Sequence, residues 1–272
     1  MGSDVDGVVE IEIWPTRWLE AKVDEANGIN ENTNTNVALI ILHSPIKDID
    51  YFRKLWSHAS FRLCADGAAN NIHDLLTSAY DCFVADDNLR AALPDVIHGD
   101  LDSIDPAVRK QYERLGVEIS QDTDQYSTDF EKAVKKVVER LPDVQDVLVL
   151  GSLGGRVDHG IGLLSDLYRE QKSRHAGIRF WLLSESSVST ILSPGTTIVH
   201  TPLESGLITR NIGILSVYGP ASITTQGLEW DVQDWPTEMG GQMSTSNHIV
   251  ADSVKITTDN HVLFTVEAAA GG

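Results

Sequence analysis

The feature that most constrains the fold is a change of pattern late in the chain. From residue 37 to about 185, apolar runs such as "NVALIILHSP" alternate with helical segments such as "DIDYFRKLWSHA". This alternation is typical of a parallel sheet flanked by helices. From "TTIVHTP" onward the segments are short, β-branched and aromatic, and Gly, Pro, Asn and Asp separate them. Helical spacing is absent there, which predicts an all-β module.

These two patterns predict two domains and a leading extension. An α/β domain with a parallel, Rossmann-like sheet is expected over residues 37–194, and an all-β sandwich over residues 195–272. Residues 1–36 read as an N-terminal extension and linker, because the amphipathic piece "VVEIEIWPTRWLE" is followed by the asparagine-rich "NGINENTNTN".

Charge and composition exclude several classes of protein. The chain has 272 residues, 40 of them acidic and 21 basic, for a formal net charge of −19. Without a cluster of Lys and Arg, a nucleic-acid-binding surface is not expected. No apolar run reaches the roughly 18 residues that span a bilayer, and the acidic start does not resemble a signal peptide. The two cysteines, Cys64 and Cys82, are expected to be reduced, so we predict a cytoplasmic protein.

Acidic side chains follow four successive predicted strands. In open α/β sheets, ligands bind outside the carboxyl ends of the strands. A single aspartate there is more often a helix cap or a turn residue, but four acidic loops on one edge repel each other unless a cation joins them. Mg²⁺ is the natural cation, since it binds carboxylates together with substrate phosphates. The acidic positions are Asp66, Asp100 and Asp102, Asp124 and Asp129, and Asp158.

Two glycine-containing turns could approach phosphate oxygens. The stretch "GSLGGRVDHG" combines four glycines, Arg156 and a helix start, and "DGAANN" is a similar turn. Backbone amides and a helix N-terminus attract anions, and an arginine can grip a phosphate. The pattern matches neither a dinucleotide-binding nor a Walker A motif, so an ordinary glycine-rich turn capped by Asp158 is an equal alternative.

In the β region, "TTQGLEW" and "MSTSNHI" are the unusual stretches. Trp230 follows a Gly-Leu-Glu turn, and "STSN" is a polar loop at a strand start. The simpler alternatives are a core tryptophan and ordinary turn chemistry. The histidines and cysteines lack the spacing of a zinc site, and no G-x-S-x-G elbow indicates a serine hydrolase.

Six stretches, taken in order, resemble the thiamine pyrophosphokinase family: "ADGAAN", "GDLDSI", "DTDQYSTDFEKA", "GSLGGRVDHG", "TTQGLEW" and "STSN". The sequence "DQYSTDF" and the N-terminal extension resemble those of the fungal branch of the family. The resemblance implies transfer of a pyrophosphoryl group from ATP to the hydroxyethyl oxygen of thiamine, with Mg²⁺, giving thiamine diphosphate and AMP. It also implies a homodimer with its sites at the subunit interface.

The resemblance assigns roles to matching positions. It implies that catalysis falls to Asp100, Asp129 and Arg156, and metal binding to Asp100, Asp102 and Asp129. The implied nucleotide- or thiamine-binding residues are Asp66, Asn70, Gln125, Thr128, Asp158, Trp230, Ser246 and Asn247. The general base is open between Asp129 and Asp100.

The chain departs from the family pattern at three places. Leu101 replaces a more usual Phe, Tyr126 and Ser127 replace an Asp-His pair, and Glu229 stands where Lys is frequent. Glu229 puts in doubt any role for a cation at this position, and it adds negative charge beside Trp230.

Two other functions could use the same residues. One is a Mg²⁺-dependent phosphohydrolase or nucleotidyl transferase, and the other is a non-catalytic thiamine or nucleotide sensor. The organic-acceptor character of "GLEW" and "STSN" argues against the former, and the presence of all the acids argues against the latter.

Overall fold

The computed structural model describes residues 10–20, 36–78, 92–151, 153 and 156–269. The chain divides into two compact units. One comprises residues 21–184, and the other comprises residues 1–20 together with residues 185–272. Of the two cysteines that we predict to be reduced, Cys82 lies outside the described residues and Cys64 is a buried free thiol.

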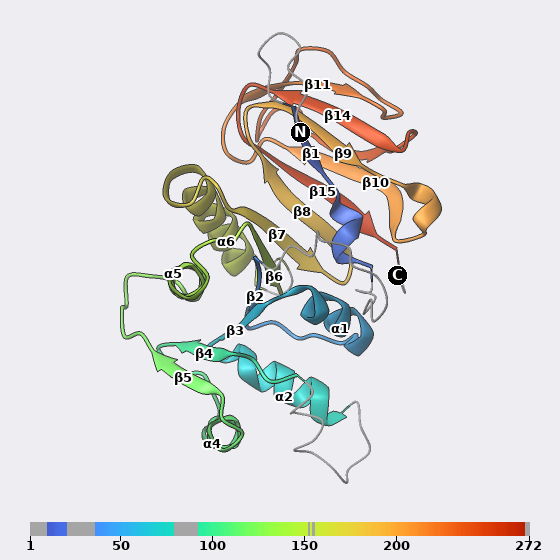
Figure 1. The fold of residues 1–272 in the computed structure, drawn as a ribbon. Coiled ribbons are helices and arrows are strands. Elements are labelled where there is room, and N and C mark those ends of the chain that lie inside the picture. Colours follow the sequence, from blue (N-terminus) through green and yellow to red (C-terminus); the bar gives the residue numbers. More distant parts are fainter. Residues whose placement is uncertain (1–9, 21–35, 79–91, 152, 154–155, 270–272) are drawn as a thin grey trace. The chain divides into compact units, whose positions relative to one another are not determined.

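The first unit, called the α/β unit, is built on a parallel sheet (Figure 1). Its strands follow the order β7-β6-β2-β3-β4-β5, and each neighbouring pair is parallel. The strands are β2 Val37–Ile41, β3 Phe61–Ala65, β4 Val96–Gly99, β5 Glu118–Gln121, β6 Asp146–Leu150 and β7 Arg179–Ser184. The helices are α1 Ile49–His58, α2 Ala68–Ser78, α4 Pro106–Arg114, α5 Asp129–Arg140, α6 Val157–Arg169 and the π-helix η2 Glu170–Arg174.

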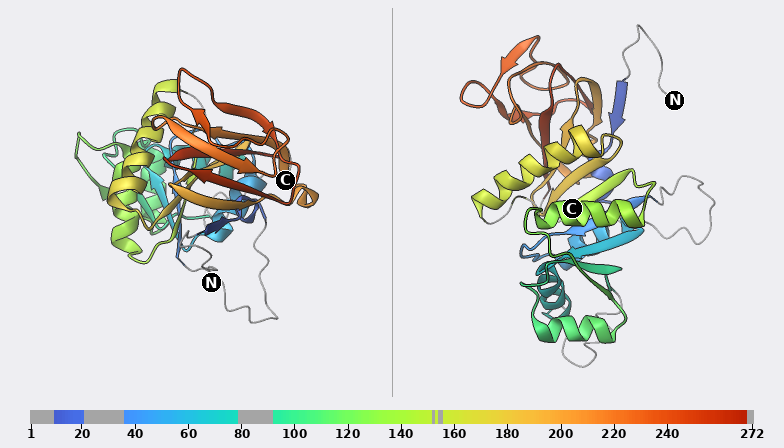
Figure 2. Two further views of the ribbon diagram at one scale, coloured as in Figure 1. Left: turned by 90° about the horizontal axis from the view of Figure 1, so that it is seen from above. Right: turned by 90° about the vertical axis from the view of Figure 1, so that its left-hand side faces the viewer.

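Local sequence explains why these elements form. Every residue of β2 and β6 is buried, as expected for strands covered by helices on both faces. Asp105 caps α4 by accepting bonds from the amides of Ala107 and Val108, and Pro106 occupies the first turn. Helices α1 and α5 lie on opposite faces of the sheet (Figures 1 and 2). Right-handed crossovers require this, because successive strands are added across the sheet in one direction from β2 to β5, and the chain then returns to the other side of β2 to form β6 and β7.

The second unit, called the β unit, contains two sheets. One has the order β1-β9-β14-β11-β12, and within this unit the other has the order β13-β10-β15-β8. The strands are β1 Glu10–Ile13, β8 Ser187–Leu192, β9 Gly195–His200, β10 Ile208–Leu215, β11 Ala221–Gln226, β12 Trp235–Thr237, β13 Ser244–His248, β14 Ser253–Thr258 and β15 Val262–Ala268. Two short 3₁₀ helices complete it, η1 Pro15–Trp18 and η3 Leu203–Ser205. Alternate residues of β14 are buried, the pattern of a strand with one face on a core.

Part of the predicted N-terminal extension is a strand of the β unit. Glu10 to Ile13 of β1 pair in parallel with Thr196 to Val199 of β9. Ile13 and Trp18 are each 1% exposed, so this segment buries large apolar side chains. A hydrogen bond between Glu12 and His200 and an ion pair between Glu10 and Lys255 hold its polar face.

The predicted fold class, a parallel α/β domain followed by an all-β sandwich, is confirmed. The division between the compact units falls at Ser184, ahead of the boundary predicted near Pro194, because β8 pairs with β15 and belongs to the β unit. Among the described residues, no helix is both long and apolar enough to cross a membrane.

Candidate active site

Three aspartates meet at the carboxyl edge of the parallel sheet. Asp66 follows β3, and Asp100 and Asp102 follow the neighbouring strand β4. One carboxylate oxygen from each lies within 4.8 Å of the other two. Asp66 is buried, Asp100 half-buried and Asp102 exposed, so the group opens toward solvent on one side. Such a set of oxygens suits a small divalent cation.

The backbone around these aspartates is strained. Asp66 has φ 42° and Leu101 has φ 65°, conformations that side-chain-bearing residues seldom adopt. Gly99 permits the close approach of the two loops, because a Cβ on it would lie 2.9 Å from the Cβ of Asp66. Strain of this kind persists where the surrounding structure enforces it, and it clusters at functional sites.

Asp66 has one satisfied and one unsatisfied oxygen. Its Oδ2 accepts a hydrogen bond from the backbone amide of Ser103 at 3.2 Å. Its buried Oδ1 has no hydrogen-bond partner within the described part of the chain. A buried polar atom without a partner is costly unless an ion or water completes it. The donor set, all carboxylate oxygens, therefore fits a Mg²⁺ ion.

Asn70 holds the loop that carries Asp102. Its side-chain amide donates to the carbonyl of Ser103 at 2.9 Å, and its Oδ1 accepts from the amide of Asp105 at 2.9 Å. Both ends of this side chain are therefore used inside the protein. Asn70 therefore positions the loop between β4 and α4, and its predicted contact with a ligand stays a prediction.

Asp129 is the first residue of α5. Thr128 caps the helix in a reciprocal capping box with Glu131. The Thr128 hydroxyl also donates to Asp166 Oδ2 at 2.7 Å, which ties the start of α5 to α6. Partial desolvation of its carboxyl group and the nearby carboxylates of Asp66 and Asp100 raise the pKa of Asp129. Asp129 thus experiences the negative field of the three-aspartate group.

Lys132 is a buried cation next to this group. Its side chain is 2% exposed, and its Nζ lies 3.4 Å from Oδ2 of Asp100. It stands one helical turn after Asp129, on the same face of α5. A buried ammonium group is stable only when it is paired. Lys132 therefore offsets part of the carboxylate charge from within the protein.

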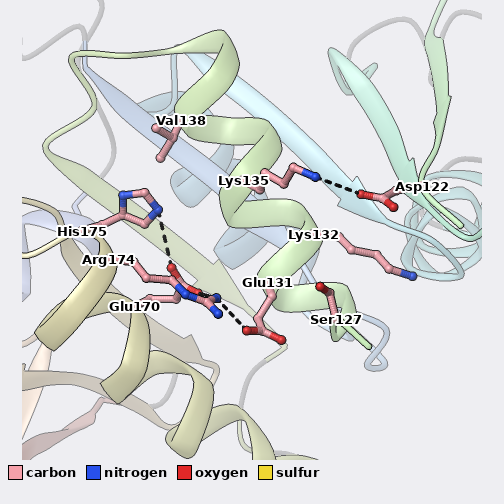
Figure 3. A pocket seen from close by; sticks show the side chains of 9 residues that line it. All are labelled: Asp122, Ser127, Glu131, Lys132, Lys135, Val138, Glu170, Arg174 and His175. Atoms are coloured by element: carbon pink, nitrogen blue, oxygen red, sulfur yellow. Dashed lines mark hydrogen bonds and ion pairs between the residues drawn. The ribbon is translucent and has the colours of Figure 1, made fainter. Parts of the chain in front are cut away.

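A cavity of about 300 Å³ opens beside α5, and Figure 3 shows the side chains that line it. Arg174 reaches Glu131 at 2.7 Å and Glu170 at 2.5 Å, and Lys135 lies 3.7 Å from Asp122. Burial opposes the ionisation of Glu131, but the Thr128 amide and Arg174 overcome it and lower its pKa. These ion pairs brace the first turns of α5, which carry Asp129 and Lys132.

Arg156 and Asp158 lie at the start of α6. Arg156 precedes the helix and grips Asp158 through Nε at 3.1 Å and Nη2 at 2.6 Å. Both side chains are exposed, and their hydrogen bonds raise the pKa of Arg156 and lower that of Asp158. Ser152, Gly154 and Gly155 of the same glycine-rich stretch lie outside the described residues. Gln125 is exposed in the loop between β5 and α5.

In the β unit, Trp230 presents its ring to solvent. Its side chain is 55% exposed, so it is not a core tryptophan. Asn247, which is buried, accepts from the Trp230 amide at 3.2 Å and donates to its carbonyl at 3.0 Å. Asn247 therefore fixes the backbone of Trp230. The neighbouring Ser246 is exposed, with φ 58°.

Comparison with known proteins identifies the family. A family model described as "Thiamin pyrophosphokinase, catalytic domain" matches residues 52–179, and one described as "Thiamin pyrophosphokinase, vitamin B1 binding domain" matches residues 196–263. Thiamine pyrophosphokinase 1 of Oryza sativa subsp. japonica is 36% identical over 218 residues, 78% of this chain and 80% of the relative. This chain belongs to the thiamine pyrophosphokinase family.

The resemblance inferred from the sequence motifs is thus confirmed, and the chain is an enzyme of the thiamine pyrophosphokinase family. The thiamine pyrophosphokinase of Saccharomyces cerevisiae is 30% identical in an alignment that covers 92% of this chain and 91% of the relative. A crystal structure of yeast thiamin pyrophosphokinase superposes with a TM-score of 0.80 at 24% identity, covering 99% of this chain and 95% of that one. This likeness supports the fold.

The structure distributes the expected site residues of this thiamine pyrophosphokinase family member over its two units. The oxygens that could hold a cation belong to Asp66, Asp100 and Asp102, whereas the sequence-based metal set has Asp129 in place of Asp66. Sequence reasoning missed Lys132, although it lies in the quoted stretch "STDFEKA". Its spacing of three residues from Asp129 on a capped helix was the signal available.

Proposed function

We propose that this chain transfers the pyrophosphoryl group of ATP to the hydroxyl group of thiamine, giving thiamine diphosphate and AMP. Membership of the thiamine pyrophosphokinase family supports the reaction. The structural observation that carries it is the group formed by Asp66, Asp100 and Asp102, with a buried unpartnered oxygen on Asp66. That group lies at the carboxyl edge of the parallel sheet, where such folds bind nucleotides.

Asp66, Asp100 and Asp102 would hold Mg²⁺, with Asp129 adjacent. When bound, the ion would neutralise charge on the phosphate oxygens and orient them. Lys132 contributes a fixed positive charge beside Asp100. Arg156 can reach toward a phosphate by exchanging its bond to Asp158, because both side chains are exposed.

The chemistry requires a proton acceptor for the thiamine hydroxyl. Its oxygen forms a bond to the β-phosphorus of ATP, the bond from that phosphorus to the oxygen bridging the α- and β-phosphates breaks, and AMP leaves with that oxygen. We propose that the carboxylate of Asp129 accepts the proton of the thiamine hydroxyl group. Asp100 is less available because it faces Lys132 at 3.4 Å. Transfer of this kind depends on positioning and charge neutralisation more than on covalent catalysis.

The β unit supplies a surface suited to the acceptor. Thiamine carries a positively charged thiazolium ring and an aromatic pyrimidine, and the exposed ring of Trp230 suits both by stacking and cation–π attraction. Ser246, beside Asn247, offers a hydroxyl at the same loop. Gln125 and Thr128, in the α/β unit, are the other implied contacts, but Thr128 is already engaged with Asp166.

The active form is proposed to be a homodimer with its sites at the subunit interface, as the family resemblance implies. Mixing the variants Asp100→Asn and Trp230→Ala, at a thiamine concentration too low for Trp230→Ala alone to turn over, tests this. If each site combines one residue from either subunit, re-associated mixtures regain about one intact site in four. No regained activity in a mixture shown to exchange subunits would contradict shared sites. The cytoplasmic location stays a prediction.

The experiment that tests the function is incubation of the purified chain with ATP, Mg²⁺ and thiamine, followed by chromatography. AMP and thiamine diphosphate in equal amounts, both lost on adding EDTA, are expected. ADP with thiamine monophosphate would place the attack at the γ-phosphorus instead. Release of phosphate without thiamine would indicate a hydrolase, and binding without turnover would indicate a sensor.

A further inference from the structure

Three charged or titratable side chains meet beside Trp230 on the surface of the β unit. Glu229 immediately precedes Trp230, Arg210 lies on β10, and His248 ends β13. Oε2 of Glu229 accepts from Nδ1 of His248 at 2.8 Å and from Nη2 of Arg210 at 3.4 Å. One carboxylate oxygen therefore holds two basic groups that come from two different strands.

This carboxylate sits next to the exposed indole. The rings of His248 and Trp230 are 5.3 Å apart between centroids and tilted by 40°. The side chains of Arg210, Glu229 and His248 remain 57%, 42% and 35% exposed, so all three, like the indole, are open to solvent. A molecule stacked on Trp230 would meet their combined charge.

The next carboxylate along the chain is not available for such a role. Asp231 Oδ1 accepts from the Thr225 hydroxyl at 3.0 Å and from the Leu228 amide at 3.1 Å. Its Oδ2 accepts from the Gly227 amide at 3.0 Å. Both oxygens of Asp231 thus accept hydrogen bonds that stabilise the turn. Within the described structure, this leaves Glu229 as the carboxylate that sets the charge beside Trp230.

We propose that Glu229 is a specificity-determining residue for a cationic heteroaromatic acceptor, because its carboxylate cancels the charge of Arg210 beside Trp230. The proposal rests on the proposed function. Without the carboxylate, the guanidinium of Arg210 would stand uncompensated next to residue 229, beside Trp230, and repel a thiazolium ring. With it, the charge of Arg210 is offset and the aromatic face can attract a cation.

The geometry separates this role from a structural one. The backbone amide of Glu229 donates to the carbonyl of His248 at 2.8 Å, a bond that no side-chain change removes. Glutamine at 229 keeps an oxygen that can accept from both His248 and Arg210, but it lacks the negative charge. Glu229→Gln therefore changes the electrostatics while leaving the loop bonded.

The test compares charged and neutral acceptors. The Michaelis constant for thiamine and the inhibition constant of its uncharged isostere, in which carbon replaces the thiazolium nitrogen, are measured for wild type and Glu229→Gln. We expect a rise of about three- to tenfold for thiamine and no change for the neutral isostere, as one uncompensated charge at a partly exposed site predicts. The Michaelis constant for ATP should stay unchanged.

Two further variants make the result specific. Glu229→Gln combined with Arg210→Met should return the thiamine constant toward the wild-type value, because the repelling charge is gone. Glu10→Gln, on β1 of the other sheet, removes the same charge elsewhere in the β unit and controls for the change in net charge. We expect Glu10→Gln to leave the Michaelis constant for thiamine within about twofold of the wild-type value.

The outcomes distinguish a failure of the proposed function from a failure of the inference about Glu229. A wild-type chain that forms no thiamine diphosphate would overturn the proposed function and this inference with it. Wild-type turnover with equal effects of Glu229→Gln on thiamine and on the neutral isostere would overturn the inference alone, since only a structural role acts on both. No effect on either, or no recovery in the double variant, would also overturn the inference while the proposed function stands.

Discussion

Removing the buried charge of Lys132 is the sharpest test of the aspartate group. Lys132→Met keeps the length of the apolar stem but deletes the ammonium that lies 3.4 Å from Asp100. Asp100 would then keep its charge among the other carboxylates without a partner. Breaking a buried ion pair by removing one side costs about 3–5 kcal/mol.

The expected signal is a difference between metal-free and metal-containing protein. In EDTA, a loss of about 3 kcal/mol lowers Tm by roughly 6–12 °C for a unit of this size. In excess Mg²⁺ the loss should be clearly smaller, because a bound cation replaces part of the missing charge. Thermal denaturation followed by circular dichroism, in each buffer, measures both values.

Lys135→Met is the matched control. Lys135 lies on the same helix and pairs with Asp122 at 3.7 Å, but its side chain is 78% exposed. Exposed pairs contribute little, so its Tm should stay within about 2 °C of wild type in either buffer. An equal Tm loss for Lys132→Met with and without Mg²⁺ would refute the reasoning, because a packing defect does not depend on the ion.

Four further outcomes follow from the site. Asp100→Asn should abolish turnover and should also lower Tm, because it leaves the buried Lys132 without its ion-pair partner; wild-type activity would remove its proposed metal role. Trp230→Ala should raise the Michaelis constant for thiamine far more than that for ATP; an equal rise in both would argue against an acceptor surface. Asn70→Ala should raise the Mg²⁺ concentration needed for half-maximal rate, because the loop carrying Asp102 loses two hydrogen bonds, and an unchanged Mg²⁺ dependence would exclude that clamp. The folded pKa of Asp129 is raised above its ordinary 3.8, so the stability it contributes is complete below that value and lost as pH rises through the folded pKa. Metal-free wild type should therefore lose stability relative to Asp129→Asn over this rise in pH, and a gain would contradict the assigned shift.

The sequence was sufficient to place the acidic residues on one sheet edge. Parallel strands put their carboxyl ends on the same side, so Asp66 and the pair Asp100 and Asp102 could be expected to meet. Which oxygens come closest depends on loop conformation, including the left-handed backbone of Leu101, and no sequence pattern specifies it. For this reason the group of oxygens in the structure contains Asp66, where the sequence-based metal set has Asp129.

Roles that depend on tertiary partners were harder to predict. The sequence suggests Asn70 and Asn247 as ligand-binding residues, which stays a prediction, and the structure adds hydrogen bonds between each amide and backbone groups of other loops. Their partners lie far enough along the chain that residue type alone gives no indication of them. The exposure of Trp230 also depends on the surrounding strands, since a tryptophan after a turn fits a core or a surface equally well.

The pairing of β1 with β9 has a consequence for how the chain is assembled. Glu10 lies opposite Thr196, and the whole α/β unit is encoded between these two strands. In topological terms, the α/β unit is an insertion within the β unit. During synthesis β1 leaves the ribosome early but has no partner until β9 follows, whereas the α/β unit can complete its sheet from contiguous sequence. We therefore expect the α/β unit to fold first, and the surface that carries Trp230 to be finished only when the last strands have been made.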